Sequence, residues 1–166
     1  MNKTKVFGVF VVLLNTALMS SADAKNAEII MHEITKLDFN MVIPRVGSCH
    51  YDVKSDEVIH GGSKSTCTFF DGKKGKIKLI AEPLKTINVE LKTKTSADGK
   101  VIFSPEGIAK VGIKEYALYT DTPVNIILDE SGVVEIETGG SLKFTSQLGQ
   151  GLEYSVDYGI SYKYVE

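Results

Sequence analysis

Four side chains between positions 49 and 67 could do chemistry together: Cys49, His50, His60 and Cys67. Two thiolates and two imidazoles form a ligand set that suits Zn²⁺. Their spacing is irregular, however, and the neighbours Cys49 and His50 would point to opposite faces of a strand. In an exported protein the two cysteines, 18 positions apart, are expected to form a disulfide, which would remove both thiolates. We therefore predict a Cys49–Cys67 disulfide and no metal site.

No other pattern in the chain predicts catalysis or a cofactor. The sequence has no Gly-x-Ser-x-Gly motif, which would mark the nucleophile of a hydrolase. The acidic stretches 52–57 and 129–131 match no calcium-loop motif, and exposed, solvated loops are the alternative to a weak calcium site. The glycine pair of stretch 61–64 lacks the rest of a phosphate-binding loop. We expect a protein without enzymatic activity and without a cofactor.

The first 24 residues have the features of a secretory signal peptide. Two lysines form a basic start, positions 6–14 are an apolar run, and Ala22 and Ala24 stand where a signal peptidase reads. The alternative is a membrane anchor, which needs about 20 apolar residues, and polar residues interrupt the run before that length. We expect cleavage after Ala24, one domain over 25–166, and an exported protein in the periplasm, at the cell surface or in the medium.

Charge and hydropathy argue against two classes of partner. Removal of residues 1–24 takes away two lysines and one aspartate, so the net charge changes from −2 to −3. No block of basic residues stands out, so nucleic acid is not an expected partner. No later segment is apolar enough to span a membrane.

The elements that must position any site read as strands. Stretches 76–82 and 86–92 alternate apolar and polar residues, which is the pattern of half-buried strands. Stretch 133–147 reads as two strands that meet in a tight hairpin turn at Gly139-Gly140. The best helix candidate is 104–121, with Ser104 as its cap, and the alternative there is a loop that leads into a strand at 115–120. Many short strands with turn signals predict an all-β fold, a β-sandwich.

The end of the chain is the longest alternating stretch. Six alternate positions are apolar or aromatic, while the residues between them are small or polar: Tyr154, Val156, Tyr158, Ile160, Tyr162 and Tyr164. Such a stretch can be an ordinary strand whose apolar face covers the core. It can also be an edge to which another strand is added, with main-chain hydrogen bonds for affinity and alternate side chains for register.

The same region carries a resemblance to a known class of proteins. The elements Gly140-x-Leu142-x-Phe144 and Gly151-x-x-Tyr154, followed by alternation to the C-terminus, resemble the end of a family of exported bacterial β-domains. That family is similar to chaperone–usher pilin subunits and spore-coat-like fimbrial proteins, and stretch 34–44 resembles its opening strand. The resemblance implies an immunoglobulin-like sandwich and a role in a surface fibre.

Two functions are therefore expected from the sequence. The first is an exported structural or adhesive subunit, which self-assembles or meets a periplasmic chaperone through the C-terminal strand. The alternative is a monomeric periplasmic or secreted binding module without catalysis, whose loops 60–65 and 104–112 contact a ligand.

Overall fold

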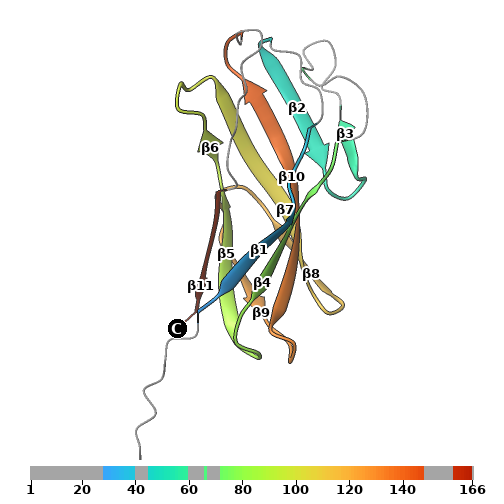
Figure 1. The fold of residues 1–166 in the computed structure, drawn as a ribbon, viewed down its shortest axis with the longest axis vertical. Helices are drawn as coiled ribbons and strands as arrows, with labels where there is room; N and C mark the ends of the chain where they lie inside the picture. The colour runs from blue at the N-terminus through green and yellow to red at the C-terminus, as the bar shows by residue number, and fades with distance from the viewer. Residues whose placement is uncertain (1–27, 40–44, 60–65, 67–71, 148–158, 166) are drawn as a thin grey trace, which may run out of the picture.

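A computed structural model describes residues 28–39, 45–59, 66, 72–147 and 159–165 of the chain. The described residues form eleven strands and no helix (Figure 1). The prediction of an all-β fold is thus confirmed. The strands are β1 (Ile30–Thr35), β2 (Gly47–Asp52), β3 (Glu57–Ile59), β4 (Gly75–Ile80), β5 (Thr86–Lys92), β6 (Lys94–Thr95), β7 (Val101–Val111), β8 (Lys114–Leu118), β9 (Val124–Ile127), β10 (Val133–Phe144) and β11 (Gly159–Tyr164).

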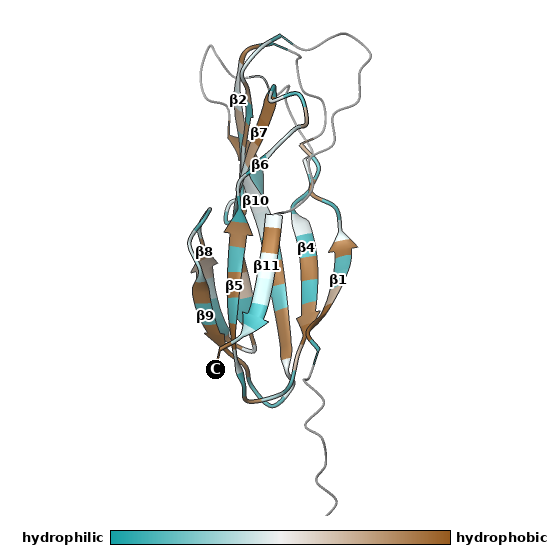
Figure 2. Cartoon of the chain, turned by 90° about the vertical axis from the view of Figure 1, so that its left-hand side faces the viewer, coloured by the Kyte–Doolittle hydropathy of each residue, from teal (hydrophilic) through white to brown (hydrophobic). Residues whose placement is uncertain are grey.

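The strands form two antiparallel sheets. The large sheet has the order β1-β4-β10-β2-β3, with β7 on the other edge of β10 and with β6 and β8 both paired to β7. The small sheet has the order β11-β5-β9. Figure 2 shows the small sheet lying in front of β4 and β10, so the lower half of the molecule is a sandwich of two layers.

The core of this sandwich follows directly from the alternation in β4 and β5. Ile87, Val89 and Leu91 of β5 are at most 1% exposed, and they lie among the buried residues Ile77 and Leu79 of β4. Their polar neighbours point outward, as the two-residue period requires. Each fully buried aliphatic side chain of this kind stabilises the fold by about 1.5–3 kcal/mol. The sequence prediction is confirmed for both strands.

A second apolar group lies in the upper half of the molecule, where β2, β7 and β10 pair. Tyr51 and Phe103 are at most 3% exposed, and Phe39 packs edge-on against both rings at centroid distances of 6.3 and 6.0 Å. Cys49 of β2 is also buried here and is not a free cysteine. Its expected partner, Cys67, lies outside the described residues, so the disulfide stays a prediction.

The predicted hairpin turn at Gly139-Gly140 is wrong. Both glycines lie inside the continuous strand β10, at the point where its partner changes from β4 to β2. A Cβ on Gly139 would lie 2.4 Å from the carbonyl oxygen of Tyr51, and one on Gly140 would lie 2.3 Å from that of Ser104. The glycines therefore allow neighbouring backbones to approach closely, which is the other common use of glycine in a strand.

The predicted helix over 104–121 is also wrong. In the alternative, the strand at 115–120 is largely confirmed by β8, but 104–111 is strand and not loop. Residues 101–118 form the hairpin of β7 and β8, and Gly112 opens its turn with a φ of 55°. Pro105 is tolerated in β7 because its carbonyl faces the gap between β6 and β8, where the Thr120 hydroxyl donates to it at 2.6 Å. The proline nitrogen, which carries no hydrogen, points toward the same gap. No hydrogen bond between paired strands is therefore lost at this position.

The expected opening strand over 34–44 is displaced. The first described strand, β1, spans Ile30–Thr35 and pairs with β4, and the backbone of Asp38 forms an isolated bridge with Lys73 outside the named strands. Residues 40–44 lie outside the described residues.

Candidate functional site

Strand β11 is the part of the expected C-terminal strand that the structure describes. Ile160, Tyr162 and Tyr164 stand opposite Leu91, Val89 and Ile87 of β5 and pack against the core while remaining partly exposed. The alternation expected for these three residues is confirmed. Tyr154, Val156 and Tyr158 lie outside the described residues.

One edge of β11 has no strand partner among the described residues. The N–H of Val165 donates to the carbonyl of Thr86 at 3.0 Å, so Val165 turns its main-chain groups toward β5. Every second residue before it in β11 does the same. In an antiparallel strand, successive residues point their N–H and C=O groups alternately toward one edge and toward the other. The main-chain groups of Ile160, Tyr162 and Tyr164 therefore face the opposite edge, which no described strand covers.

The described residues close the sandwich only in part beside this free edge. On β1, Met31 stands opposite the buried Leu79, so its side chain lies on the core-facing side of the sheet. Met31 is nevertheless 42% exposed, whereas Ile29 near the start of β1 is 9% exposed. In Figure 2, β11 lies on the side of β5 nearest to β4 and β1. We name this region the open edge and define it as Met31, Glu33, Ile160, Tyr162 and Tyr164.

The lower end of the open edge is held in place by a hydrogen bond. The hydroxyl of Tyr164 accepts from the backbone N–H of Glu82 at 2.8 Å, just beyond the end of β4. This bond ties β11 to the turn between β4 and β5. The C-terminal end of β11 is therefore attached to the large sheet as well as to β5.

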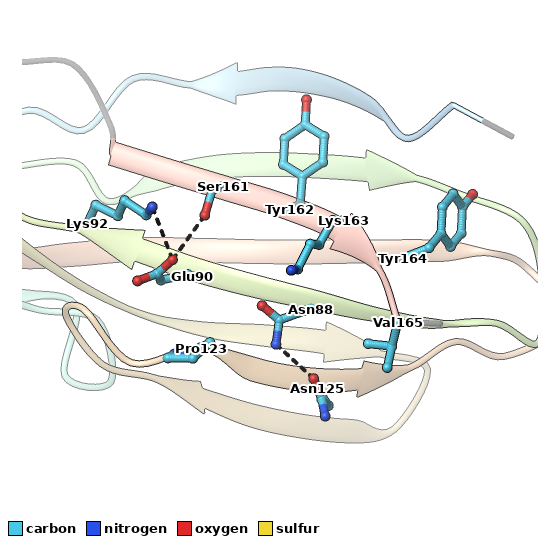
Figure 3. A pocket seen from close by; sticks show the side chains of 10 residues that line it. All are labelled: Asn88, Glu90, Lys92, Pro123, Asn125, Ser161, Tyr162, Lys163, Tyr164 and Val165. Atoms are coloured by element: carbon cyan, nitrogen blue, oxygen red, sulfur yellow. Dashed lines mark hydrogen bonds and ion pairs between the residues drawn. The ribbon is translucent and has the colours of Figure 1, made fainter. Parts of the chain in front are cut away.

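A polar hollow lies on the opposite, outward face of the small sheet. Figure 3 shows Asn88 donating to Asn125 at 2.8 Å, and Glu90 accepting from Ser161 at 3.2 Å while pairing with Lys92 at 3.3 Å. The full lining is Asn88, Glu90, Lys92, Pro123, Asn125, Ser161, Tyr162, Lys163, Tyr164 and Val165. Amide, ammonium, hydroxyl and carboxylate groups thus meet on three strands, and this mixture suits a polar ligand.

The sequence-predicted metal candidates are only partly described. The His50 ring nitrogen Nδ1 lies 2.9 Å from the Ser141 hydroxyl, while His60 and Cys67 are outside the described residues. Within the described ranges, no group of three or more histidine, cysteine or acidic residues is arranged to hold a metal ion.

The acidic stretches considered for calcium act in turns. Asp52 accepts from the backbone N–H groups of Lys54 at 2.7 Å and Ser55 at 3.2 Å, and these bonds lower its pKa. Asp129 accepts from the hydroxyl and the N–H of Ser131, which lower its pKa as well. Such side-chain bonds to nearby backbone groups are the usual reason for aspartate in a turn.

Tyr51 makes stability sensitive to alkaline pH. Burial, together with its hydrogen bond to Asp56 at 2.8 Å, raises the pKa of Tyr51 to about 12 from its ordinary 10.0. Because the unfolded chain loses this proton first, the stabilisation is complete below pH 10.0 and is lost as the pH rises to about 12.

We therefore expect Tyr51→Phe to flatten the fall of unfolding free energy over this pH range. The measurement is urea denaturation at several alkaline pH values. Tyr119→Phe, at a residue that is 61% exposed, is the control and should keep the wild-type pH dependence. An unchanged profile for Tyr51→Phe would contradict the role given to its hydroxyl.

Comparison with known proteins adds no relative. No family model, no curated protein and no solved structure matches this chain. The structure forms no helix that is long and apolar enough to cross a membrane, within the residues it describes. Function must therefore be inferred from the open edge and the polar hollow themselves.

Sequence reasoning missed two parts of the site. Met31 and Glu33 lie in stretch 25–35, which the sequence offers as a candidate donor strand with Ile29, Met31 and Glu33 on one face, and not as a strand beside the C-terminal one. The polar hollow combines residues of β5, β9 and β11. The alternation in stretch 86–92 predicts which of its residues point outward. The sequence of this stretch does not indicate which strands lie beside it in the sheet.

Proposed function

We propose that this chain is an exported structural or adhesive subunit that joins its partners by β-strand addition at the free edge of β11. The observation that carries the proposal is the unpaired edge of β11, beside core-facing side chains that the described residues cover only in part. An added strand would satisfy the main-chain groups of Ile160, Tyr162 and Tyr164 and would cover Met31. Peptide recognition by addition to a sheet edge works in this way.

We further infer that the sandwich is immunoglobulin-like. In such a sandwich, strands A, B, E and D form one sheet, and strands C, F and G form the other. In chain order and in sheet order, β1, β4, β10 and β7 correspond to the first set, and β5 and β11 correspond to C and F. Among the described residues no strand corresponds to G, which would pair with the free edge of β11. This gap supports assembly by strand addition.

The experiment is a denaturing gel of surface extracts from the native host, blotted for this chain with and without boiling. Polymers joined by an added strand resist detergent until they are heated, so we expect a ladder that collapses on boiling. A single monomer band in both lanes would contradict the proposal.

Two variants at one residue isolate the contribution of the main chain. Tyr162→Pro removes the N–H that faces the free edge, whereas Tyr162→Ala loses the same ring and keeps that N–H. We expect Tyr162→Ala to weaken the ladder and Tyr162→Pro to abolish it, with both proteins folded by circular dichroism. Equal ladders in the two variants would argue against main-chain pairing at this edge.

A second candidate function is a monomeric binding module. The polar hollow favours it, because its amide, ammonium and hydroxyl groups converge on one face of the small sheet. The loops that the sequence suggested for this role do not support it: 104–111 is strand, and 60–65 lies outside the described residues. This candidate expects a monomer in both lanes, so the same gel separates the two functions.

A further inference from the structure

Glu33 is a carboxylate on the core-facing side of an edge strand. In the pairing of β1 with β4, Glu33 stands opposite Ile77, which is 2% exposed and belongs to the core. Directly opposed residues share a face of the sheet, so the Glu33 side chain lies on the same side as Met31. It is exposed, and none of the ion pairs between described residues includes it.

A charge at such a position affects which strands can be added. Inward-pointing charges on edge strands of natural sheets reject unwanted partners. Here the added strand would lie beside β11, in the sheet that faces β1, and its inward side chains would bury the Glu33 charge without a counter-ion. A strand that brings its own opposite charge avoids this cost. The open edge is otherwise apolar or aromatic on its inner side, so Glu33 is its single charged group.

Strand directions indicate where along β11 this charge acts. The Tyr164 hydroxyl accepts from the N–H of Glu82, which lies just beyond the C-terminal end of β4. Ile30 of β1 pairs with Ile80, the last residue of β4. Tyr164 and Ile30 therefore lie at the same end of the sandwich. Glu33 is three residues further along β1, about 10 Å away at the rise of a strand. Ile160 is four residues back along β11, about 13 Å from Tyr164 by the same rise. Tyr162 is two residues back, about 7 Å from Tyr164, so Glu33 is level with the part of the free edge between Tyr162 and Ile160.

We propose that Glu33 selects the strand that is added at the open edge. The preferred partner is an extended segment with an apolar side chain at the inward position beside Tyr164, and a lysine or arginine at the inward position nearest Glu33, between Tyr162 and Ile160. This inference rests on the proposed strand addition and specifies the chemistry of the partner. A segment that carries aspartate or glutamate in place of this lysine or arginine is rejected.

The test uses the purified mature monomer and fluorescently labelled synthetic peptides. In each peptide, valine at the inward positions alternates with threonine at the outward positions. In the first set of three peptides, the inward residue nearest the N-terminus is replaced by lysine, glutamine or glutamate. In the second set the same replacement is made nearest the C-terminus, because the peptide could bind β11 in either direction. Fluorescence polarisation measures the dissociation constants. We expect the lysine peptide of one set to bind at least about tenfold more tightly than its glutamate counterpart, since opposite charge replaces like charge.

Charge reversal in the protein gives the decisive comparison. Glu33→Lys should reverse the preference between the lysine and glutamate peptides, and Glu33→Gln should remove it. His32→Lys adds a positive charge to the other face of the same strand, so it is the matched control and should leave the preference unchanged.

The outcomes separate the two levels of the proposal. Failure of every peptide to bind would overturn strand addition at β11 and this inference with it. Binding of all peptides with equal affinity would overturn the role of Glu33 alone, and so would a lysine preference that persists in Glu33→Lys.

Discussion

Replacement of Gly140 by alanine should lower the free energy of unfolding by about 3–5 kcal/mol, a large part of what a small domain has. The φ of Gly140 is 126°, in a region that other residues rarely adopt. An added Cβ would also lie 2.3 Å from the carbonyl oxygen of Ser104 and 2.8 Å from the Cα of Pro105. Both neighbours are backbone atoms, so they cannot move aside cheaply. Urea denaturation measures the effect.

Gly99→Ala is the matched control for this prediction. Gly99 also has a positive φ, of 72°, but no atom lies within 4 Å of the position that its Cβ would take. We expect a loss of only about 1 kcal/mol, from the backbone conformation alone. Similar losses for the two variants would show that the close contact across β10 is unimportant.

Reduction of the expected Cys49–Cys67 bridge should have the second large effect, a loss of about 3 kcal/mol for a loop of this length. Cys49 is 2% exposed within the upper apolar group, so the bridge would attach the segment beyond β3 to that group. Denaturation with and without a reducing agent measures the loss.

The control is the double variant Cys49→Ala/Cys67→Ala, which should be insensitive to the reducing agent and about as stable as the reduced wild-type protein. Wild-type stability that does not change on reduction would contradict the bridge. Detection of a stoichiometric metal in the purified protein would favour the zinc alternative instead.

Local pattern was sufficient for the fold class and for two central strands. In β4 and β5, alternation is nearly complete, and the buried residues are those that the pattern selects. It failed at β7, because Pro105 and Gly107 occupy inward positions there and hide the two-residue period. It failed at β10, because a glycine pair is compatible both with a turn and with close packing of backbones. Only the long-range partners distinguish these two cases.

The candidate site was predictable in one half only. The inward residues of β11 follow from alternation, and the sequence identified them. That one edge of β11 lacks a described partner depends on the order of strands in both sheets, which no local pattern contains. Glu33 shows the same limit, since an exposed glutamate in a short strand gains significance only when its neighbour across the sheet is a buried isoleucine.

The position of β10 in the large sheet has a consequence for the order of folding. β10 pairs with β4, β2 and β7, and it comes later in the chain than every other strand of that sheet. A chain is synthesised from its N-terminus, and an exported chain is also translocated from that end, so the hairpins β2–β3 and β7–β8 can form early. The half of the sheet that contains β4 cannot close before residue 138 is available, and the half that contains β2 cannot close before residue 144. Until then the edges of β4 and β2 that pair with β10 expose a row of unpaired main-chain groups, and such edges are templates for pairing with another chain.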